Sequence, residues 1–537
     1  MIQKALNSIN MQSLITYFLP FLLFLFFLHK WVSTKSIKKQ NLPPSPPKLP
    51  IIGHIHMLGM LPHRTLRSLS DQYGELMLLY FGSKPTLIVS SARVAKEVMK
   101  THDAVIANRF EFIINGKLFY NYRDVVTSSY GEYWRQMKSI FVLQLLSNKR
   151  VRSFKNIREE ETALLMKKIS QKNNNNTNNS NNNNNNNNKK KNDNDNDNGA
   201  IVNLSEMFMV LTNDLICRVS FGRKYGEDKK SGVDFNVIKE FVELLGVVNI
   251  GDFIPWLGWM NRFNGLNAKV ERVAERFDLL LEDIITEHLN RLDQARDFDN
   301  YEAKDFVDVL LKAQREKSVG FTLERENIKA MILDAFAAGT DTTYTVLEWA
   351  MTELLRNPRI MKEVQKEVRE IGGEKHHITE DDLENMKYLK AVMKETLRMY
   401  PPIPLLVPRV STQDTKINGY DIPADTLVFV NAWAVQRDPA IWEKPEEFCP
   451  ERFLNSSVEL KGQDFELIPF GGGRRICPAI SFVMANNELV LANLMHKFNW
   501  RLPDGVKAEN LDMSESTGLT IHRNIPLLAV ATPYFQD

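Results

Sequence analysis

The sequence has few cysteines and almost no net charge. Its 537 residues include three cysteines, Cys217, Cys449 and Cys477, too few and too scattered for a disulfide framework or a clustered metal site. A reducing compartment is therefore expected. The 68 basic and 66 acidic residues leave a net charge of +2, which argues against a nucleic-acid polymer as the main partner.

The sequence also lacks a nicotinamide or flavin motif, and its one long uncharged apolar run covers only residues 14–28. That run is short for a full membrane span, and a cleaved signal peptide is the alternative. No small-residue cleavage site follows it, so we expect an uncleaved anchor. The basic residues after it predict a cytosolic globular part, and the short run suits the thin endoplasmic reticulum membrane.

Three parts of the chain are expected: an anchor over residues 1–32, a basic and proline-rich hinge over 33–50, and a large domain over 51–537. Residues 172–198 are nearly all Asn, Lys and Asp, so they predict a disordered surface loop. Residues 76–81 and 86–90 read as a hairpin. Most of the remainder has the periodicity of amphipathic helices, so the fold should be mainly α with a minor β portion.

A single cysteine lies within residues 470–479, which read FGGGRRICPA. Consecutive glycines allow backbone angles closed to other residues, so the loop can turn tightly and direct its N–H groups at whatever Cys477 binds. The helix expected after Pro478 places a positive helix end near the sulfur and favours the thiolate. A lone thiolate suits haem better than zinc or an iron–sulfur cluster, which need several ligands.

Residues 327–356 predict a long helix with one face of small residues. Spacings of i, i+3, i+4 and i+7 place on that face Ala335, Ala338, Gly339 and Thr342. Close helix packing is the simpler explanation of such a face. The neighbouring Asp341 favours a functional one, because an acid and a hydroxyl in an apolar helix are costly unless they are used or satisfied.

A second helix is predicted over residues 387–399, with Glu395 and Arg398 three positions apart on one face. Such a pair is usually solvated and only weakly stabilising. Proline residues then end the helix, and Arg452 follows downstream in a proline-marked turn.

Together these residues resemble the cytochrome P450 family, the haem-thiolate monooxygenases, and specifically its plant endoplasmic-reticulum members. Phe470, Gly473, Arg475 and Cys477 match the haem-binding signature, and residues 338–343 match the oxygen-activating segment. The ExxR pair is matched by Glu395 and Arg398, with Arg452 as the third member of that triad. The resemblance covers the chain except the Asn-rich insert. It implies the P450 fold, with haem b (iron protoporphyrin IX) between the long oxygen-activating helix and the helix after the cysteine loop.

The resemblance also implies residue roles. Cys477 would be the axial iron ligand, Asp341 and Thr342 would supply protons during oxygen activation, and the triad would hold the cysteine loop in a structural role. The haem propionates would meet Trp134, Lys138, Arg409 and Arg475. Lys138 stands where an arginine is common, and Ala479 where a glycine is common. Substrate-pocket candidates are the loop 108–121 with Ala335, Ala338, Leu405, Leu406, Val407, Gly518 and Leu519; ordinary core is the alternative for the apolar ones.

The activity implied is oxidation of a small lipophilic plant specialised metabolite, a terpenoid, coumarin or other phenylpropanoid-derived compound. O2 and a separate NADPH-cytochrome P450 reductase are required. The protein would be a single-pass endoplasmic reticulum membrane protein with a cytosolic catalytic domain. One alternative is a haem-thiolate isomerase or dehydratase that acts without O2, and another is a haem sensor or electron carrier. The Asp341–Thr342 pair argues against both, because neither needs proton delivery to oxygen.

Overall fold

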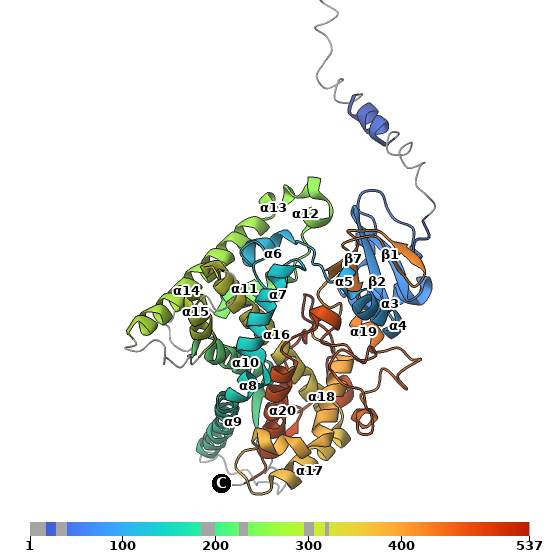
Figure 1. Ribbon diagram of the computed structural model, residues 1–537. Helices are drawn as coiled ribbons and strands as arrows, with labels where there is room; N and C mark the ends of the chain where they lie inside the picture. The colour runs from blue at the N-terminus through green and yellow to red at the C-terminus, as the bar shows by residue number, and fades with distance from the viewer. Residues whose placement is uncertain are drawn as a thin grey trace, which may run out of the picture.

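The computed structural model describes residues 18–27, 40–183, 199–224, 235–294, 305–316 and 322–535. Helices make up most of the regular structure in the described chain, with a few small sheets (Figure 1), which confirms the prediction of a mainly α fold. The largest sheet has the order β1-β2-β7-β4. Its strands are β1 (Leu76–Phe81), β2 (Lys84–Val89), β7 (Leu427–Val430) and β4 (Arg409–Val410).

The predicted hairpin is β1 and β2, paired antiparallel with Leu76 opposite Val89. The turn is tighter than expected, because β2 already begins at Lys84. Gly82 takes a φ of +58°, and a Cβ there would collide with the carbonyl of Phe253. The smaller sheets are β3 (Ala200–Asn203), β9 (Leu528–Pro533) and β8 (Phe498–Arg501), and β5 (Thr415–Ile417) with β6 (Tyr420–Ile422).

The helices before α16 (Arg325–Arg356) fall into two groups: α3, α4 and α5 lie beside the largest sheet, and α6 to α15 lie on the other side of the molecule (Figure 1). They are α3 (Pro62–Tyr73), α4 (Ala92–Lys96), α5 (Asp103–Ile106), α6 (Ile113–Leu118), α7 (Glu132–Phe141), α8 (Asn148–Ser153), α9 (Lys155–Asn183), α10 (Leu204–Phe221), α11 (Phe235–Leu245), α12 (Ile250–Phe253), α13 (Met260–Phe263), α14 (Leu266–Gln294) and α15 (Phe306–Glu316).

The later helices are α16 (Arg325–Arg356), α17 (Pro358–Gly372), α18 (Lys387–Met399), α19 (Ala432–Val435) and α20 (Ile480–Lys497). Short 3-10 segments cover Ile55–Met57, Pro255–Leu257, Glu380–Asn385, Pro450–Phe453, Gly473–Arg475 and Ala508–Asn510, and π-type turns cover Glu97–Thr101 and Val142–Leu146.

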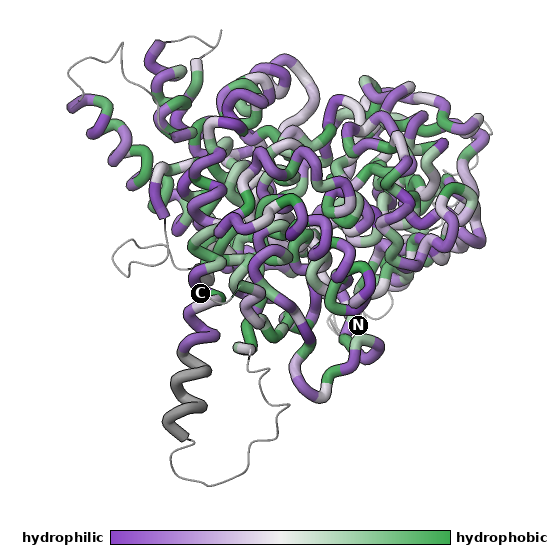
Figure 2. Tube along the Cα trace, turned by 90° about the horizontal axis from the view of Figure 1, so that it is seen from below, coloured by the Kyte–Doolittle hydropathy of each residue, from purple (hydrophilic) through white to green (hydrophobic). Residues whose placement is uncertain are grey.

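α16 is the central helix of the fold. Its N-terminal half packs into one buried cluster with α10, α11, α14 and α15, and its C-terminal half into another with α17, α18 and α20. A helix apolar on every side can be stable only when it is surrounded in this way. The hydropathy of the chain follows the same plan, with hydrophobic segments gathered inside the body (Figure 2). The predicted end of α16 at Asn357 is confirmed.

The Asn-rich region differs in part from the prediction. α9 continues through Asn183, so the irregular loop does not begin at residue 172, and residues 184–198 lie outside the described residues. Once a helix is nucleated, each added residue costs little, so the amphipathic start of α9 can carry polar residues with it. The Asn173 side chain accepts a hydrogen bond from Ala200 N at 2.6 Å, which fixes the start of β3 against this helix.

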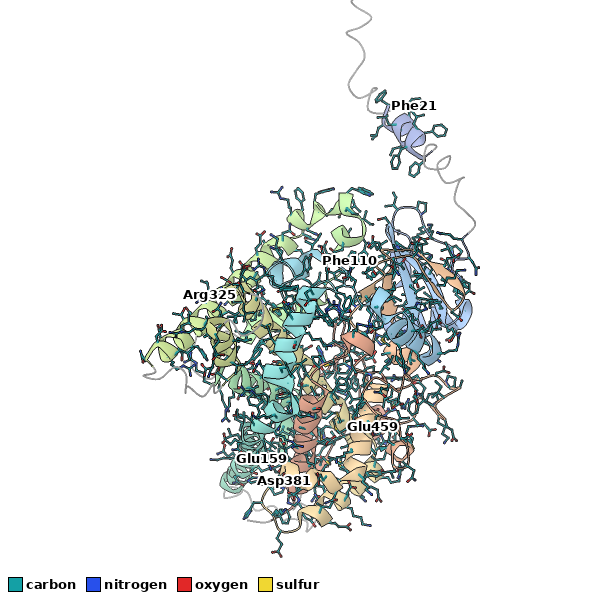
Figure 3. All side chains as sticks on the ribbon, in the orientation of Figure 1. Phe21, Phe110, Glu159, Arg325, Asp381 and Glu459 are labelled. Atoms are coloured by element: carbon teal, nitrogen blue, oxygen red, sulfur yellow. The ribbon has the colours of Figure 1, made fainter. Side chains whose placement is uncertain are left out.

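Only part of the predicted anchor is described, as the apolar helix Phe18–Phe27, whose side chains are exposed, including that of Phe21 (Figure 3). Within the described residues no single helix is both long and apolar enough to cross a membrane. One bent pair, Lys239–Phe253 with Pro255–Phe263, meets the length and composition requirements despite a 111° break.

Candidate active site

The cysteine loop is held in a tight turn between the sheet region and α20. Cys477 N donates to the carbonyl of Phe470 at 2.9 Å, which closes the loop. Gly473 has a φ of +66°, and a Cβ there would collide with the carbonyl of Met99. Gly471, with a φ of +70°, and Gly473 therefore take backbone angles that favour glycine, as the sequence indicated, and Gly473 also allows a close approach to Met99. Ala479 has a φ of −94°, a backbone conformation that needs no glycine.

An aspartate that the sequence analysis missed clamps this loop. Asp103, at the start of α5, accepts hydrogen bonds from Arg474 N at 2.8 Å and from the Arg474 side chain at 3.0 Å. Its other oxygen accepts from Arg409 at 2.9 Å, and Arg409 also donates to the Gly472 carbonyl at 2.6 Å. Arg409 therefore supports the loop from β4. No sequence motif marks Asp103, because a lone acid at the start of a helix is commonly solvated.

The Cys477 thiol lies just before the first turn of α20. Burial raises the pKa of this thiol, while a hydrogen bond from Ala479 N and the charge of Lys138 act in the opposite direction. The start of α20 therefore lowers the pKa of the thiol, as expected, but burial raises this pKa by more. A cation bound at the sulfur would reverse the balance, because a coordinating thiol loses its proton.

Several buried guanidinium groups meet beside the loop. Burial and the charges of Arg475 and Arg409 lower the pKa of Arg109 well below its ordinary value. Burial, followed by the charge of Arg409, lowers the pKa of Arg475 to about 9. Asp103 and Asp124 offset this positive charge only in part. A group carrying two carboxylates fits such a site, as the two propionates of a haem would.

The four residues expected at the propionates are close together. The Arg475 guanidinium lies 4.2 Å from the centre of the Trp134 ring, and Lys138 Nζ lies 5.0 Å from it. These side chains donate to backbone carbonyls. Arg475 donates to the carbonyls of Ala107, Val125 and Ser128. Trp134 donates to the Val125 carbonyl, and Lys138 to the Arg474 carbonyl.

The small face of α16 lies inside the molecule and is only partly covered. Ala338 is exposed and Gly339, Asp341 and Thr342 are half-buried, although the residues on α16 before Ala338 and after Thr342 are buried. The Thr342 hydroxyl donates to the Ala338 carbonyl at 2.6 Å. Room beside a small helix face suits a flat cofactor. Ala335 is almost fully buried and belongs to the apolar cluster around α10 and α14, which favours its alternative role as core.

Asp341 is enclosed by polar side chains from the C-terminal segment. Its carboxylate accepts a hydrogen bond from the Thr520 hydroxyl. The Tyr344 side chain, on α16, also hydrogen-bonds to it, and His522 interacts with it electrostatically. Burial raises the pKa of Asp341, and these three partners limit the rise. The carboxyl group is thus poised to hold and release a proton nearer to neutral pH. Thr520 is a further residue that motif matching missed.

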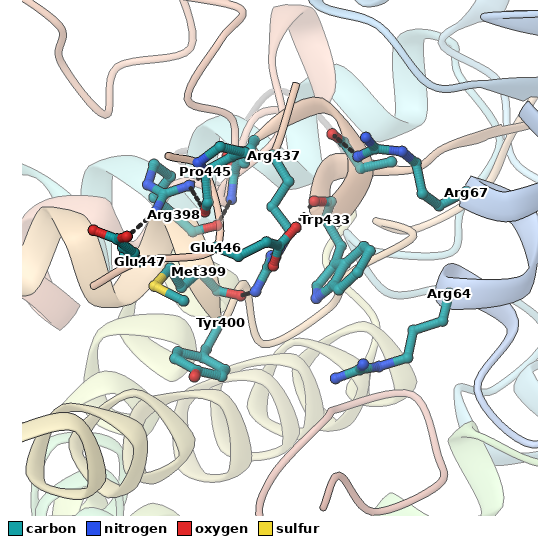
Figure 4. Close-up of polar contacts among 12 residues, drawn as sticks. Arg64, Arg67, Arg398, Met399, Tyr400, Trp433, Arg437, Pro445, Glu446 and Glu447 are labelled. Carbon is teal, nitrogen blue, oxygen red and sulfur yellow. Dashed lines mark hydrogen bonds and ion pairs between the residues drawn. The ribbon is translucent and has the colours of Figure 1, made fainter. Parts of the chain in front are cut away.

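The predicted structural triad is present and fully connected. Arg398 donates to both oxygens of Glu395, at 2.7 and 2.9 Å, and Arg452 Nε donates to Glu395 at 3.1 Å. Cys449 N adds a fourth hydrogen bond at 2.8 Å. Arg398 also reaches the carbonyls of Gln436 at 2.9 Å and Pro445 at 2.8 Å, the latter drawn in Figure 4.

Gln436 connects this triad to the cysteine loop. Its amide donates to the carbonyls of Leu397 at 2.9 Å and Arg398 at 2.8 Å, and its oxygen accepts from Ile468 N at 2.8 Å. Ile468 lies two residues before Phe470, so the expected link between the triad and the loop runs through this one buried side chain.

The remaining pocket candidates lie near the loop or at its periphery. Leu405, Leu406 and Val407 are half-buried, and Leu406 lies 3.7 Å from the position of a Cβ on Gly471. The Val407 carbonyl accepts from Arg109 at 2.8 Å. Gly518 is exposed and Leu519 half-buried, next to Gly246 after α11.

Comparisons with known proteins identify the family of the chain. A family model described as Cytochrome P450 matches residues 43–528. The chain is 51% identical over 541 residues to Cytochrome P450 736A117 from Prunus mume, covering 99% of each chain. It is 49% identical to Cytochrome P450 71A4 from Solanum melongena (96% of this chain, 97% of that one) and 46% identical to norfluorocurarine oxidase from Strychnos sp (95% and 96%). A zebra fish cytochrome P450 structure with progesterone matches with a TM-score of 0.72 at 24% identity, covering 88% of this chain and 99% of that chain.

Proposed function

This chain belongs to the cytochrome P450 family of haem-thiolate monooxygenases, and we propose on that basis that it oxidises a small lipophilic plant specialised metabolite. Candidate substrates are terpenoids, coumarins and other phenylpropanoid-derived compounds. The plant relatives support this class, and one of them is named as an oxidase of norfluorocurarine. We further propose that electrons come from NADPH through a separate reductase, in keeping with the absence of a flavin or nicotinamide motif.

The residues around the loop have distinct tasks in this proposal. Cys477 binds the iron, and Arg475, Arg409, Lys138 and Trp134 surround the propionates. The haem, when bound, supplies the oxygen-activating chemistry. The chain would supply the thiolate, a loop held by hydrogen bonds and a proton source.

The observation that carries the oxygenase proposal is the Asp341–Thr342 pair. Asp341 is an enclosed carboxyl group whose pKa is raised by burial, and Thr342 is a hydroxyl on the accessible small face of the same helix. An acid whose pKa is raised from its ordinary value toward the working pH is a better placed proton donor than a solvated carboxylate. A rearranging enzyme or an electron carrier has no use for such a pair.

Reconstitution of the full chain with a reductase in vesicles tests the proposal. Product should require O2, NADPH and reductase together, and should contain one oxygen atom from labelled O2. Product formed without O2 would instead support the isomerase or dehydratase alternative. Substrate-induced shifts of the haem spectrum across the three compound classes would identify the ligand class first.

We expect Thr342→Ala to preserve the haem spectrum but to divert electrons to hydrogen peroxide. A positioned proton donor contributes about 10²- to 10⁴-fold to a proton-transfer step, so product per NADPH should fall by about tenfold or more. Thr352→Ala is the matched control, since its buried hydroxyl makes the same contact to a carbonyl one turn earlier, at 2.7 Å from that of Glu348. Undiminished product per NADPH in Thr342→Ala would contradict the proton-delivery role.

We propose that the protein is held on the endoplasmic reticulum membrane, with its catalytic domain cytosolic. Besides the helix Phe18–Phe27, an exposed apolar surface covers α12, α13 and the turns beside them: Val247, Val248, Ile250, Trp256, Trp259, Met260 and Phe263. Phe263 is 82% exposed. The Phe253 carbonyl accepts from Ser83 N at 3.2 Å, so this surface adjoins the sheet that receives the hinge. Aromatic residues are favoured at membrane interfaces.

Brominated lipids should quench part of the tryptophan fluorescence of the full chain in vesicles. Trp256→Phe/Trp259→Phe should show clearly less quenching, because these two rings would lie at the lipid interface. Trp500→Phe removes a buried ring and should leave the lipid-dependent quenching unchanged. Equal quenching in wild type and the double variant would show that α12 and α13 do not contact lipid.

A further inference from the structure

Two aspartates from separate elements meet inside the protein next to the guanidinium cluster. Asp124 lies in the loop before α7 and is fully buried, while Asp334 lies on α16 and is 3% exposed. Neither belongs to a motif of the sequence, and neither has a part in the mechanism above. Buried acids are costly unless paired or hydrogen-bonded, so their arrangement needs an explanation.

The contacts of the two acids are best satisfied when one of them carries a proton. Asp334 Oδ2 accepts from Val125 N at 2.5 Å, and the Val126 N–H adds a second backbone contact. Asp124 accepts from Thr127 N at 2.7 Å and from the Thr127 hydroxyl. Among the described residues no hydrogen-bond partner reaches the buried Asp334 Oδ1, and the side chains of Asp334 and Asp124 interact. Two carboxyl groups can share a hydrogen bond only if one is protonated.

The backbone that Asp334 holds is the backbone that orients the propionate residues. The Val125 carbonyl accepts from Trp134 Nε1 at 3.0 Å and from Arg475 at 3.2 Å. The Val126 carbonyl accepts from Arg109 Nε at 2.9 Å. Each peptide therefore binds α16 through its N–H and an arginine or tryptophan through its carbonyl. A shift of these two peptides would move three side chains of the site together.

We propose that Asp124 and Asp334 form a carboxylic acid–carboxylate pair that shares one proton, and that Asp334 is a positioning residue for the propionate end of the haem site. The positioning acts through the Val125 and Val126 peptides on Trp134, Arg475 and Arg109. This part rests on the haem site of the proposed function, whereas the shared proton is a property of the chain alone.

The charge of the pair is matched to its surroundings. Arg109 and Arg475 face Asp124, and the Tyr133 hydroxyl faces both acids. Burial and the charge of Asp124 raise the pKa of Asp334 well above its ordinary value. A pair with one negative charge leaves a positive surplus for an anionic group. Two negative charges would compete with that group for the arginines.

Asparagine and alanine at position 334 separate the two parts of the proposal. The amide introduced by Asp334→Asn can still accept from Val125 N and donate to Asp124, so this variant should retain haem at close to the wild-type rate of loss to apomyoglobin. Asp334→Ala leaves both N–H groups unpaired and should lose haem faster on the order of tenfold. Asp252→Asn is the matched control, because Asp252 also accepts one backbone N–H, from Ile113 at 2.9 Å, away from the site.

The proton itself is visible without haem chemistry. Wild type should show the infrared carbonyl band of a buried protonated carboxylic acid, and Asp334→Asn should lack it. Because the folded protein keeps this proton at a pH where unfolded Asp has lost it, above about 4, wild-type stability falls as pH rises toward the folded pKa. Asp334→Asn removes that fall, so the melting midpoint of this variant should rise relative to that of wild type as the pH increases above about 5.

The control variant sets the comparison for the pH profile. Burial raises the pKa of Asp252 to about 6, so the gain of Asp252→Asn over wild type should level off near that pH. A pH profile of Asp334→Asn that runs parallel to that of wild type, with the carbonyl band still present, would overturn the shared proton. Wild-type haem retention in Asp334→Ala would overturn the positioning role. If Asp334→Ala fails to fold, the band and the pH profile of Asp334→Asn decide the shared proton. Asp334→Leu, which fills the space but cannot accept from Val125 N, then decides the positioning role, because haem loss from this variant at the wild-type rate would exclude it. A wild type that binds no haem would refute the proposed function but leave the band and the pH profile as tests of the pair.

Discussion

Cys477→Ser should abolish oxygenase activity and remove the red-shifted absorption of the reduced carbon monoxide complex. The thiolate donates electron density to the iron, which a serine oxygen cannot match. Loss of an outer contact at a metal site costs about 10- to 100-fold, so loss of the ligand itself should exceed about 100-fold in product formation.

The fold should survive this change, which makes the result interpretable. The loop is closed by backbone atoms, Cys477 N to the Phe470 carbonyl, and is clamped by Asp103, so the sulfur has no part in its shape. Cys449→Ser is the control, because Cys449 contributes its backbone N–H rather than its sulfur to Glu395. An unchanged spectrum in Cys477→Ser would show that another residue binds the iron.

Glu395→Ala should prevent recovery of stable holoprotein. It leaves two arginines and the Cys449 N–H without their shared acceptor in a fully buried place. Breaking a buried ion pair from one side costs about 3–5 kcal/mol, which is a large part of the stability of a typical domain. We expect little haem incorporation and early loss of the soluble protein on heating.

Arg359→Ala supplies the matched comparison. Arg359 pairs with Glu451 at 2.8 Å, but its side chain is 68% exposed, and exposed pairs contribute about 0–1 kcal/mol. Haem content and thermal inactivation should therefore stay close to wild type. If Glu395→Ala proved as stable as Arg359→Ala, the triad would not be what holds the loop.

The parts of the site that the sequence predicted depend on local constraints. Consecutive glycines before Cys477, the i, i+3 spacing of Glu395 and Arg398, and the small face of α16 each have a physical reason within a few residues of chain. Their identification as parts of one site came from the resemblance, and the family match and fold confirm the class.

The parts that were missed depend on tertiary contacts. Asp103, Asp124 and Asp334 are isolated acids whose burial cannot be inferred from their neighbours in sequence. Gln436 has no distinguishing feature in the sequence, because its hydrogen bond from Ile468 N exists only in the folded protein. The extent of α9 was also misjudged, because composition predicted a loop where a preceding helix continues. The helix-end argument for the Cys477 thiolate had the right direction but omitted burial, which is set by the whole fold.

The clamp on the cysteine loop has a consequence for how the protein is made. Arg474 and Asp103 are joined across 371 residues of sequence, and the loop also needs α18 in place through Gln436. At about 5–20 residues per second, a ribosome adds that intervening length in tens of seconds. The cofactor site therefore cannot form when the N-terminal sheet is first synthesised. Haem capture has to follow synthesis of nearly the whole chain.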